Sequence, residues 1–158
     1  MADPMYEPDD IVCEQYKVVR QLGAGGFAKT FLVQDTKCLD AIRVLKVLSS
    51  GMSPELFERE ARKLESIGKA PGFPTLFAFM QDGDRFLLIM QYIEGPDLSE
   101  RVGQLRNLSD VVRFISDALD ALCVLQRNHI VHRDIKPSNL IHSVEEGKTY
   151  VVDFGIAK

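Results

Sequence analysis

Short segments rich in apolar residues, separated by turn signals, make up most of the first ninety residues and predict β-strands. The first two strands flank a glycine-rich turn, and the last two are joined at Asp82-Gly83-Asp84, which favours a hairpin. The five stretches are QYKVVRQL, KTFLVQD, AIRVLKVL, PTLFAFMQ and RFLLIMQYI.

Helical spacing of apolar residues appears in two places. After Ser53-Pro54-Glu55, which suits a helix start, apolar side chains recur at three- and four-residue steps until Gly68. A longer helix, which Ser109 can cap, precedes Asn128. Its apolar positions are Val111, Val112, Ile115, Leu119, Leu122 and Leu125.

The segment EGPD, Glu94 to Asp97, breaks the strand pattern and predicts a domain boundary. Residues 11–93 then form a unit of sheet with one helix, and residues 94–158 form a mainly helical unit with short strands. Residues 1–10, which are acidic and contain two prolines, predict a disordered tail. The fold class expected from this order of elements is α+β.

Composition excludes several classes of function. The chain is 46% hydrophobic and 27% charged with a net charge of −4, which gives no electrostatic reason to expect a nucleic-acid partner. The longest apolar run, FLLIM, is too short to span a membrane, and the N-terminus lacks the apolar core of a secretory signal. The three cysteines are widely spaced and form no CxxC pair. We therefore expect a cytoplasmic protein.

The segment LGAGGFAKT places Gly23 and Gly25 between two predicted strands. Glycines allow backbone N–H groups to approach a phosphate closely, but a flexible hairpin turn explains an isolated G-x-G equally well. A dinucleotide-binding motif would need a helix after the glycines, and a Walker A loop would need Gly-Lys-Ser/Thr. The residues that follow, KTFLV, fit neither.

The order of motifs resembles the signature set of eukaryotic-type serine/threonine protein kinases, in their bacterial form. GAGGFA is followed by a strand with Lys46, a helix with Glu60, the loop HRDIKPSN and DFG. The resemblance covers Tyr16 to Lys158, about the first half of a kinase domain. It implies a five-stranded antiparallel small-lobe sheet with one helix, followed by the first, mainly helical part of the large lobe.

The resemblance further implies transfer of the ATP γ-phosphate to a serine or threonine hydroxyl of a protein, with ATP and Mg²⁺ as cofactors. Lys46 would hold the α- and β-phosphates, and Glu60 would pair with Lys46. In the residues alone, Glu60 also fits a solvated helix face, and Glu58 is the alternative partner, although it would point to another face.

The HRDIKPSN and DFG motifs supply the remaining catalytic residues of the resemblance. Asp134 would accept or orient the proton of the substrate hydroxyl, and Lys136, typical of the serine/threonine class, would contact the transferred phosphate. Asn139 and Asp153 would hold the magnesium ions. His132 is expected to be a packing residue against Phe154 and Leu64, and Arg133 to pair with a phosphorylated activation segment.

Nucleotide contacts are assigned by the same resemblance to the glycine-rich loop, the strand lysine and the hinge. Met90 would be the gatekeeper, the backbones of Gln91 and Ile93 would bond adenine, and Asp97 would reach the ribose. For the apolar members, ordinary core membership is equally compatible. The full set is Leu22, Gly23, Ala24, Gly25, Gly26, Phe27, Ala28, Thr30, Val44, Lys46, Met90, Gln91, Ile93, Asp97 and Leu140, with Val152 as a further apolar contact.

The sequence departs from the kinase pattern at Ala28, which replaces the third glycine, and at Thr30 and Val44 in the adenine pocket. It also stops at DFGIAK, before any A-P-E motif. Three hypotheses remain open: a truncated serine/threonine kinase, a catalytically incomplete ATP-binding or regulatory fragment, and a gene fragment without a stable product. With no later helices to cover it, the long helix would expose an apolar face, which implies a partner covering that face, aggregation or partial disorder.

Overall fold

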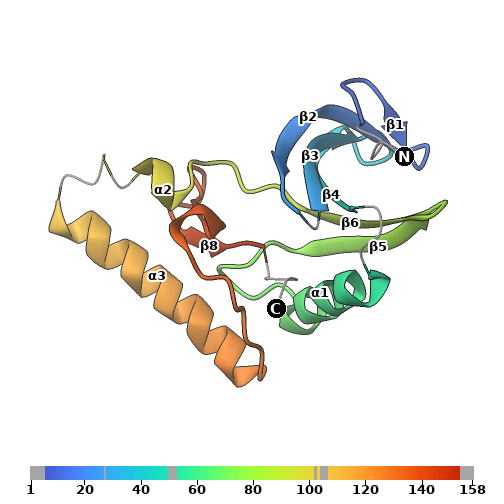
Figure 1. The fold of residues 1–158 in the computed structure, drawn as a ribbon. Helices are drawn as coiled ribbons and strands as arrows, with labels where there is room; N and C mark the ends of the chain where they lie inside the picture. Colours follow the sequence, from blue (N-terminus) through green and yellow to red (C-terminus); the bar gives the residue numbers. More distant parts are fainter. Residues whose placement is uncertain (1–5, 27, 50–52, 102, 104–106, 154–158) are drawn as a thin grey trace. The chain divides into compact units, whose positions relative to one another are not determined.

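The computed structural model describes residues 6–26, 28–49, 53–101, 103 and 107–153 (Figure 1). The chain forms two compact units. The first unit contains Met1–Arg62 and Leu76–Tyr92, and the second contains Lys63–Thr75 and Ile93–Lys158. The division between Tyr92 and Ile93 lies next to the boundary expected at EGPD. Sequence patterning did not indicate that Lys63–Thr75 belongs with the second unit.

The first unit is built on an antiparallel sheet whose described strands follow the order β1-β2-β3-β4-β6-β5. The five expected strands are present, and a two-residue strand at the edge adds a sixth. The strands are β1 (Ile11–Val12), β2 (Tyr16–Ala24), β3 (Ala28–Asp35), β4 (Ala41–Leu48), β5 (Leu76–Asp82) and β6 (Arg85–Gln91).

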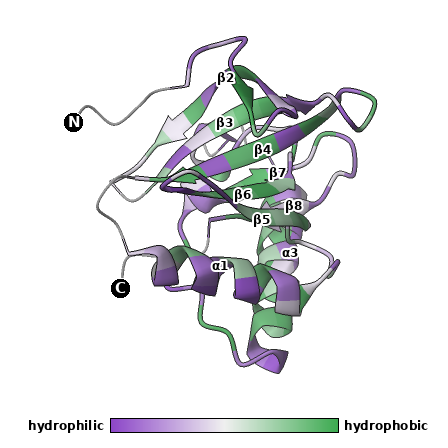
Figure 2. Cartoon of the chain, turned by 90° about the vertical axis from the view of Figure 1, so that its right-hand side faces the viewer, coloured by the Kyte–Doolittle hydropathy of each residue, from purple (hydrophilic) through white to green (hydrophobic). Residues whose placement is uncertain are grey.

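One face of this sheet carries the core of the first unit, and β4 and β6 supply part of it. Figure 2 shows hydrophobic residues along both strands. Alternate residues of a strand point to the same face of the sheet, so the core residues gather on one face and the residues between them lie on the other. The buried members are Val12, Tyr16, Val18, Phe31, Val33, Leu45, Val47, Leu87 and Ile89.

Residues 6–10 differ from the expected disordered tail, because they make defined contacts with the sheet. The ring of Tyr6 packs edge-on against Phe31, with 5.7 Å between centroids, and the Arg85 guanidinium lies 5.1 Å from the Tyr6 ring centroid. Backbone bonds join Asp9 N to Val18 O and Val18 N to the carbonyl of Asp10. Residues 1–5 lie outside the described residues.

Helix α1 (Pro54–Ile67) follows the pattern expected from its sequence. The Ser53 hydroxyl bonds the Glu55 carboxylate at its start, where an acidic side chain also suits the helix dipole. Gly68 ends the helix with a φ of +64°, and its N–H bonds the carbonyls of Leu64 and Glu65. The apolar side of α1 meets the sheet through Phe57, which is fully buried and packs edge-on against Phe79 of β5, with 6.5 Å between ring centroids.

The second unit contains helices α2 (Leu98–Arg101) and α3 (Leu108–Arg127), the short 3₁₀ helix η2 (Pro137–Asn139), and a two-stranded sheet of β7 (Leu140–His142) and β8 (Thr149–Val151). Helix α3 begins one residue before the expected cap Ser109. Its cap is Asn107, whose side-chain oxygen accepts a bond of 2.8 Å from Asp110 N. Asparagine caps a helix as well as serine does, and Ser109 instead lies in the first turn of the helix.

The segment EGPD runs close beside β7 in the second unit. Val144 N bonds Glu94 O and His142 N bonds Pro96 O, each at 3.0 Å. Gly95 lies between these contacts with a φ of +155°, and a Cβ at that position would lie 1.9 Å from the carbonyl oxygen of His142. The glycine is therefore required by a close approach of two backbones as well as by its dihedral angle.

Candidate active site

The register of the first unit aligns several of the expected nucleotide contacts on one sheet face. Lys46 of β4 is paired with Thr30 of β3 and with Leu88 of β6, and Val44 is paired with Met90. Residues two apart on a strand share a face, and so do directly paired residues on neighbouring strands. Thr30, Val44, Lys46 and Met90 therefore share one face of the sheet, opposite the core cluster.

Helix α1 supplies a carboxylate to this face. The Lys46 Nζ atom lies 2.8 Å from Oε1 and 2.9 Å from Oε2 of Glu60, and both side chains are buried. The neighbouring Glu58 instead bonds Arg62 one turn along the helix, at the surface. The structure thus pairs Lys46 with Glu60 and gives Glu58 a separate partner.

The glycine-rich turn joins β2 to β3 and is closed by a 2.9 Å bond from Gly25 N to Ala28 O. Gly23, Gly25 and Gly26 do not have positive φ angles, so the turn itself does not require glycine. A Cβ on Gly23 or Gly26 would meet nothing within 4 Å, so the backbone there is open to an approaching group. Phe27 lies outside the described residues.

Ala28 is buried at the start of β3, two residues before Thr30, and therefore lies on the same face of the sheet as Thr30 and Lys46. This departure from the kinase pattern therefore adds a methyl group to the face of the sheet that carries Lys46. Leu22 and Ala24 belong to the end of β2, which precedes the turn. Leu22 is half-buried and Ala24 is exposed.

The hinge residues divide between the two units. Met90 is buried and Gln91 is half-buried in the first unit, whereas Ile93 is buried in the second. Asp97 is the N-terminal cap of α2: its Oδ1 accepts bonds from Glu100 N at 3.1 Å and from the Ser99 hydroxyl. The Ser99 hydroxyl, more than any other group, lowers the pKa of the Asp97 carboxyl from its ordinary value.

The HRDIKPSN segment of the second unit brings three predicted site residues together. Lys136 Nζ lies 2.8 Å from Oδ2 of Asp134. The side-chain nitrogen of Asn139 donates to the backbone oxygen of Asp134 at 2.8 Å and to its Oδ2 at 3.0 Å. The Lys136 ammonium, as the largest cause, and the Asn139 amide lower the pKa of the Asp134 carboxyl, which favours its ionised form.

His132 is buried, as expected of a packing residue, and it also connects the HRDIKPSN loop to the segment that follows β8. Its Nε2 lies 3.2 Å from Val152 O, and its Nδ1 accepts from Asp134 N at 3.3 Å. These partners require a proton on Nε2 and none on Nδ1, which is the neutral ring. Burial lowers the pKa of His132 and so favours that neutral form. Its expected partner Phe154 lies outside the described residues.

Asp153 follows directly from this bonded network. Val152 N donates to Asn139 O at 2.9 Å, and Asp153 itself is exposed with a φ of +60°. Both bonds from the Asn139 side chain use its nitrogen, so the amide oxygen is the atom suited to a cation. One amide oxygen and one carboxylate are hard ligands that fit Mg²⁺, which keeps waters and phosphate oxygens as its other ligands.

Within the described part of the chain, three or more His, Cys, Asp or Glu side chains do not gather into a metal site. Asn139 and Asp153 are only two side chains, so a magnesium ion held by them would need phosphate oxygens or waters as its other ligands. Among the same described residues, no helix is long and apolar enough to cross a bilayer.

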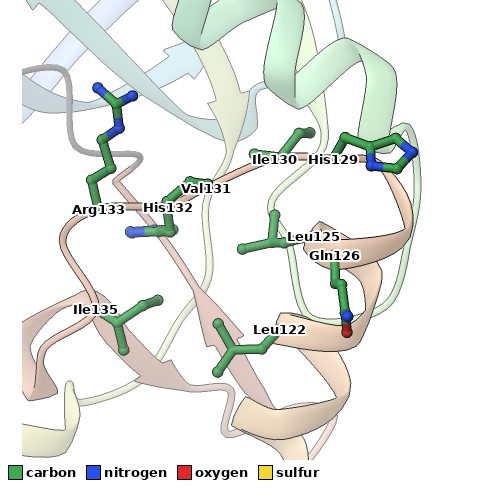
Figure 3. Close-up of a pocket in the computed structure, with 9 residues that line it drawn as sticks. All are labelled: Leu122, Leu125, Gln126, His129, Ile130, Val131, His132, Arg133 and Ile135. Atoms are coloured by element: carbon green, nitrogen blue, oxygen red, sulfur yellow. The ribbon is translucent and has the colours of Figure 1, made fainter.

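A separate apolar hollow of about 520 Å³ lies between the end of α3 and the irregular segment that leads to His132 (Figure 3). Leu122, Leu125 and Ile135 line it, and it contains none of the predicted nucleotide contacts. It adjoins an exposed apolar stripe on α3, which matches the expectation that this face is uncovered. The stripe comprises Leu108, Val112, Ile115, Leu119 and Leu122.

The model of the protein kinase domain family matches residues 16–158. The chain belongs to the protein kinase family. Protein kinases use ATP and Mg²⁺, and the two residue clusters described above contain the lysine–glutamate pair and the loop motif typical of the family.

The kinase relatives include bacterial and animal proteins. Serine/threonine-protein kinase C of Synechocystis is 37% identical over 168 residues, which cover 98% of this chain and 31% of that protein. Serine/threonine-protein kinase PknA of Nostoc is 31% identical, with 95% of this chain and 29% of that protein covered. Serine/threonine-protein kinase greatwall of Bos taurus is 30% identical, with 98% and 18% covered. The chain thus spans less than a third of these relatives.

Sequence reasoning did not identify two glycines that shape the second unit of the chain. Gly95 is required by the close approach to His142, and Gly72 has a φ of +85° and accepts a bond from Val151 N at 2.8 Å. Each stands in a Pro-Gly or Gly-Pro pair, which is a turn signal. Such a pair predicts a turn. It does not indicate which distant segment of backbone the glycine will approach.

Proposed function

We propose that this chain is the ATP-binding and catalytic-loop portion of a protein kinase that phosphorylates serine or threonine hydroxyls of proteins. The observation that carries the proposal is the buried bidentate pair of Lys46 and Glu60. A lysine so fixed presents a localised positive charge, as the binding of nucleotide phosphates requires. The bonded cluster of Asp134, Lys136 and Asn139 supports the same function.

In the proposed reaction, the oxygen of the substrate hydroxyl forms a bond to the γ-phosphorus while the bond between that phosphorus and the β,γ-bridging oxygen breaks, and ADP leaves. Bound Mg²⁺ would neutralise charge on the phosphates. Asp134, held in its ionised form, would orient the hydroxyl and accept its proton, and Lys136 would attract the transferred phosphoryl group.

The nucleotide contacts remain part of the proposal. The glycine-rich turn would cover the phosphates, and Asn139 and Asp153 would supply the protein oxygens for Mg²⁺. The backbones of Gln91 and Ile93 would bond adenine. We also propose that Asp97 reaches the ribose, although its Oδ1 already caps α2. A cytoplasmic location is proposed with it, and the three free cysteines are compatible with a reducing compartment.

A second candidate function is an ATP-binding fragment that is catalytically incomplete until a partner or further polypeptide covers it. The exposed apolar stripe of α3 favours this function, because contiguous apolar surface of this kind marks an interaction site. Under this proposal the first unit binds nucleotide, while phosphate transfer requires the covering polypeptide.

The experiment that tests the function compares the wild-type chain with Lys46→Met. Mg·ATP binding is measured by calorimetry, and transfer of labelled phosphate is measured to a generic protein substrate such as casein. Binding and transfer that both disappear in Lys46→Met support the kinase. Binding without transfer supports the incomplete fragment, and equal nucleotide affinity in the two proteins contradicts both.

A further inference from the structure

Strand β8 is held along its outer edge by groups that do not belong to its hairpin partner β7. The bond from Ser143 N to Lys148 O means that the next pair, His142 and Thr149, does not exchange backbone bonds, since bonded and non-bonded pairs alternate. The N–H groups of Thr149 and Val151 therefore point away from β7 and need other partners.

Both outward N–H groups have partners at hydrogen-bond distance. Val151 N donates to Gly72 O at 2.8 Å. Thr149 N donates to the Oδ2 atom of Asp117, also at 2.8 Å. Asp117 belongs to α3, so a helix carboxylate takes the place that the carbonyl of a neighbouring strand would occupy. Because Thr149 is buried, its N–H would have no water to replace the carboxylate.

Helix α3 holds Thr149 through Asp117, and it also lies against the loop at Gly72 that holds Val151. A Cβ on Gly72 would lie 3.4 Å from the Cβ of Ala121 and 3.7 Å from Thr149 O. Ala121 is one turn beyond Asp117, and residues four apart lie on the same side of a helix. One side of α3 therefore fixes the outer edge of β8 in two places. It bonds Thr149 directly through Asp117, and it supports the Gly72 loop that bonds Val151.

The anchored strand leads to the predicted metal ligand without an intervening loop. Two residues after Val151 comes Asp153, and the residue between them, Val152, bonds Asn139 O and lies within reach of His132 Nε2. We propose that Asp117 is a positioning residue for Asp153, acting through β8. This inference rests on the proposed function, in which Asp153 holds Mg²⁺ together with Asn139.

If Asp117 only stabilised the fold, its loss would lower overall stability without a specific effect on Mg²⁺ affinity. A positioning role predicts that loss of the carboxylate lets β8 shift relative to Asn139, so that the two magnesium ligands no longer match. Groups that orient metal ligands in proteins commonly change metal affinity 10- to 100-fold when removed, so an effect of about tenfold is expected.

The test uses Asp117→Ala, Asp117→Asn and the control Asp120→Ala, whose side chain is exposed on the same helix. Mg²⁺ is titrated at a fixed concentration of a non-hydrolysable ATP analogue, and nucleotide affinity is also measured in EDTA. We expect Asp117→Ala to need about tenfold more Mg²⁺, with Asp117→Asn and Asp120→Ala within about threefold of wild type, because asparagine keeps an oxygen acceptor.

Nucleotide affinity in EDTA should change less than about twofold in all three variants, because the proposed defect lies in the metal ligands. Unchanged Mg²⁺ dependence in Asp117→Ala would overturn the inference. An equal loss of nucleotide affinity with and without Mg²⁺ would overturn it as well, since a general loss of structure produces that result.

Amide hydrogen exchange gives a readout that does not depend on nucleotide. In Asp117→Ala, the amides of Thr149, Val151 and Val152 should exchange at least about tenfold faster, while the amides of α1 stay unchanged. Exchange that is unaltered, or that rises evenly along the chain, contradicts the positioning role. If the wild type does not bind nucleotide, the proposed function fails, and the exchange result still decides whether Asp117 fixes β8.

Discussion

Lys46 and Glu60 form a bidentate ion pair that is almost fully removed from water. The two nitrogen–oxygen distances are 2.8 and 2.9 Å, and only 6% and 2% of the side-chain surfaces are exposed. At this depth, attraction between the charges is offset by the cost of removing each from water. Such a pair contributes little net stability, yet either member left alone is strongly unfavourable. The arrangement is therefore better explained by function than by stability.

We expect Lys46→Met and Glu60→Leu each to lower the free energy of unfolding of the chain by roughly 3–5 kcal/mol, since each leaves one buried charge without its partner. The double variant Lys46→Met/Glu60→Leu should recover most of this loss without recovering ATP affinity. Urea unfolding and nucleotide calorimetry measure the two quantities separately.

The surface pair of Glu58 and Arg62 is the matched control on the same helix. Arg62→Ala should change the free energy of unfolding by no more than about 0.5 kcal/mol, because exposed pairs contribute little. Two results would disprove this account of the Lys46–Glu60 pair. One is a loss of unfolding free energy in Lys46→Met/Glu60→Leu that equals the sum of the losses in the single variants, and the other is ATP binding by that double variant.

Asp134 should be needed for phosphate transfer and not for nucleotide binding. We expect Asp134→Asn to keep Mg·ATP affinity within about twofold and to lower the transfer rate of an active form of the kinase by about 10²- to 10⁴-fold, the range of general-base catalysis. Calorimetry and a labelled-phosphate assay measure the two effects. A large loss of affinity would instead assign Asp134 to nucleotide binding.

Much of the first unit could be predicted from its sequence because its elements are specified locally. Short apolar segments between turn signals indicated the strands, and Gly68 marked the end of α1. Strand register, however, depends on pairing across the sheet, so the common face of Thr30, Lys46 and Met90 was visible only through the kinase resemblance. The choice between Glu58 and Glu60 likewise needed the position of α1.

The second unit was less predictable, because its key contacts join residues distant in sequence. Asp117 reads as a polar position on an amphipathic helix, and nothing near it identifies Thr149 as its partner. The cap of α3 was misassigned to Ser109 because Asn107 and Ser109 are both good caps.

Gly95→Ala tests the close approach between the EGPD segment and β7. Its Cβ would overlap the carbonyl of His142, and its φ of +155° is unfavourable for alanine. Overpacking and backbone strain together should cost roughly 2–6 kcal/mol in the free energy of unfolding. Thermal unfolding checks this, with Gly103→Ala as the control, since a Cβ at Gly103 meets nothing within 4 Å. Equal melting temperatures for the two variants would contradict the account.

The pH dependence of stability should reflect the buried, neutral His132. Burial lowers its pKa below the ordinary 6.5, so between the folded and unfolded pKa values the unfolded chain binds more protons. The contribution of neutral His132 to the free energy of unfolding is then fully present above about pH 7. It is lost as the pH falls from 6.5 toward the lower pKa of the folded state. Melting temperatures between pH 5.5 and 7.5 measure the slope. His132→Gln should make it shallower, whereas an unchanged slope would show that His132 is not a source of it.

The exposed stripe on α3 predicts association through an uncharged apolar surface. Ile115 and Leu119 are more than half exposed, at 54% and 55%, whereas Leu125 on the packed side is only 2% exposed. Ile115→Gln/Leu119→Gln should reduce aggregation and binding of a hydrophobic dye, with little change in melting temperature. The control Leu125→Gln should unfold the second unit, because it buries an unpaired amide. If the double variant instead lowers the melting temperature as much as Leu125→Gln, the stripe is part of the folded core and the proposal of a covering partner is wrong.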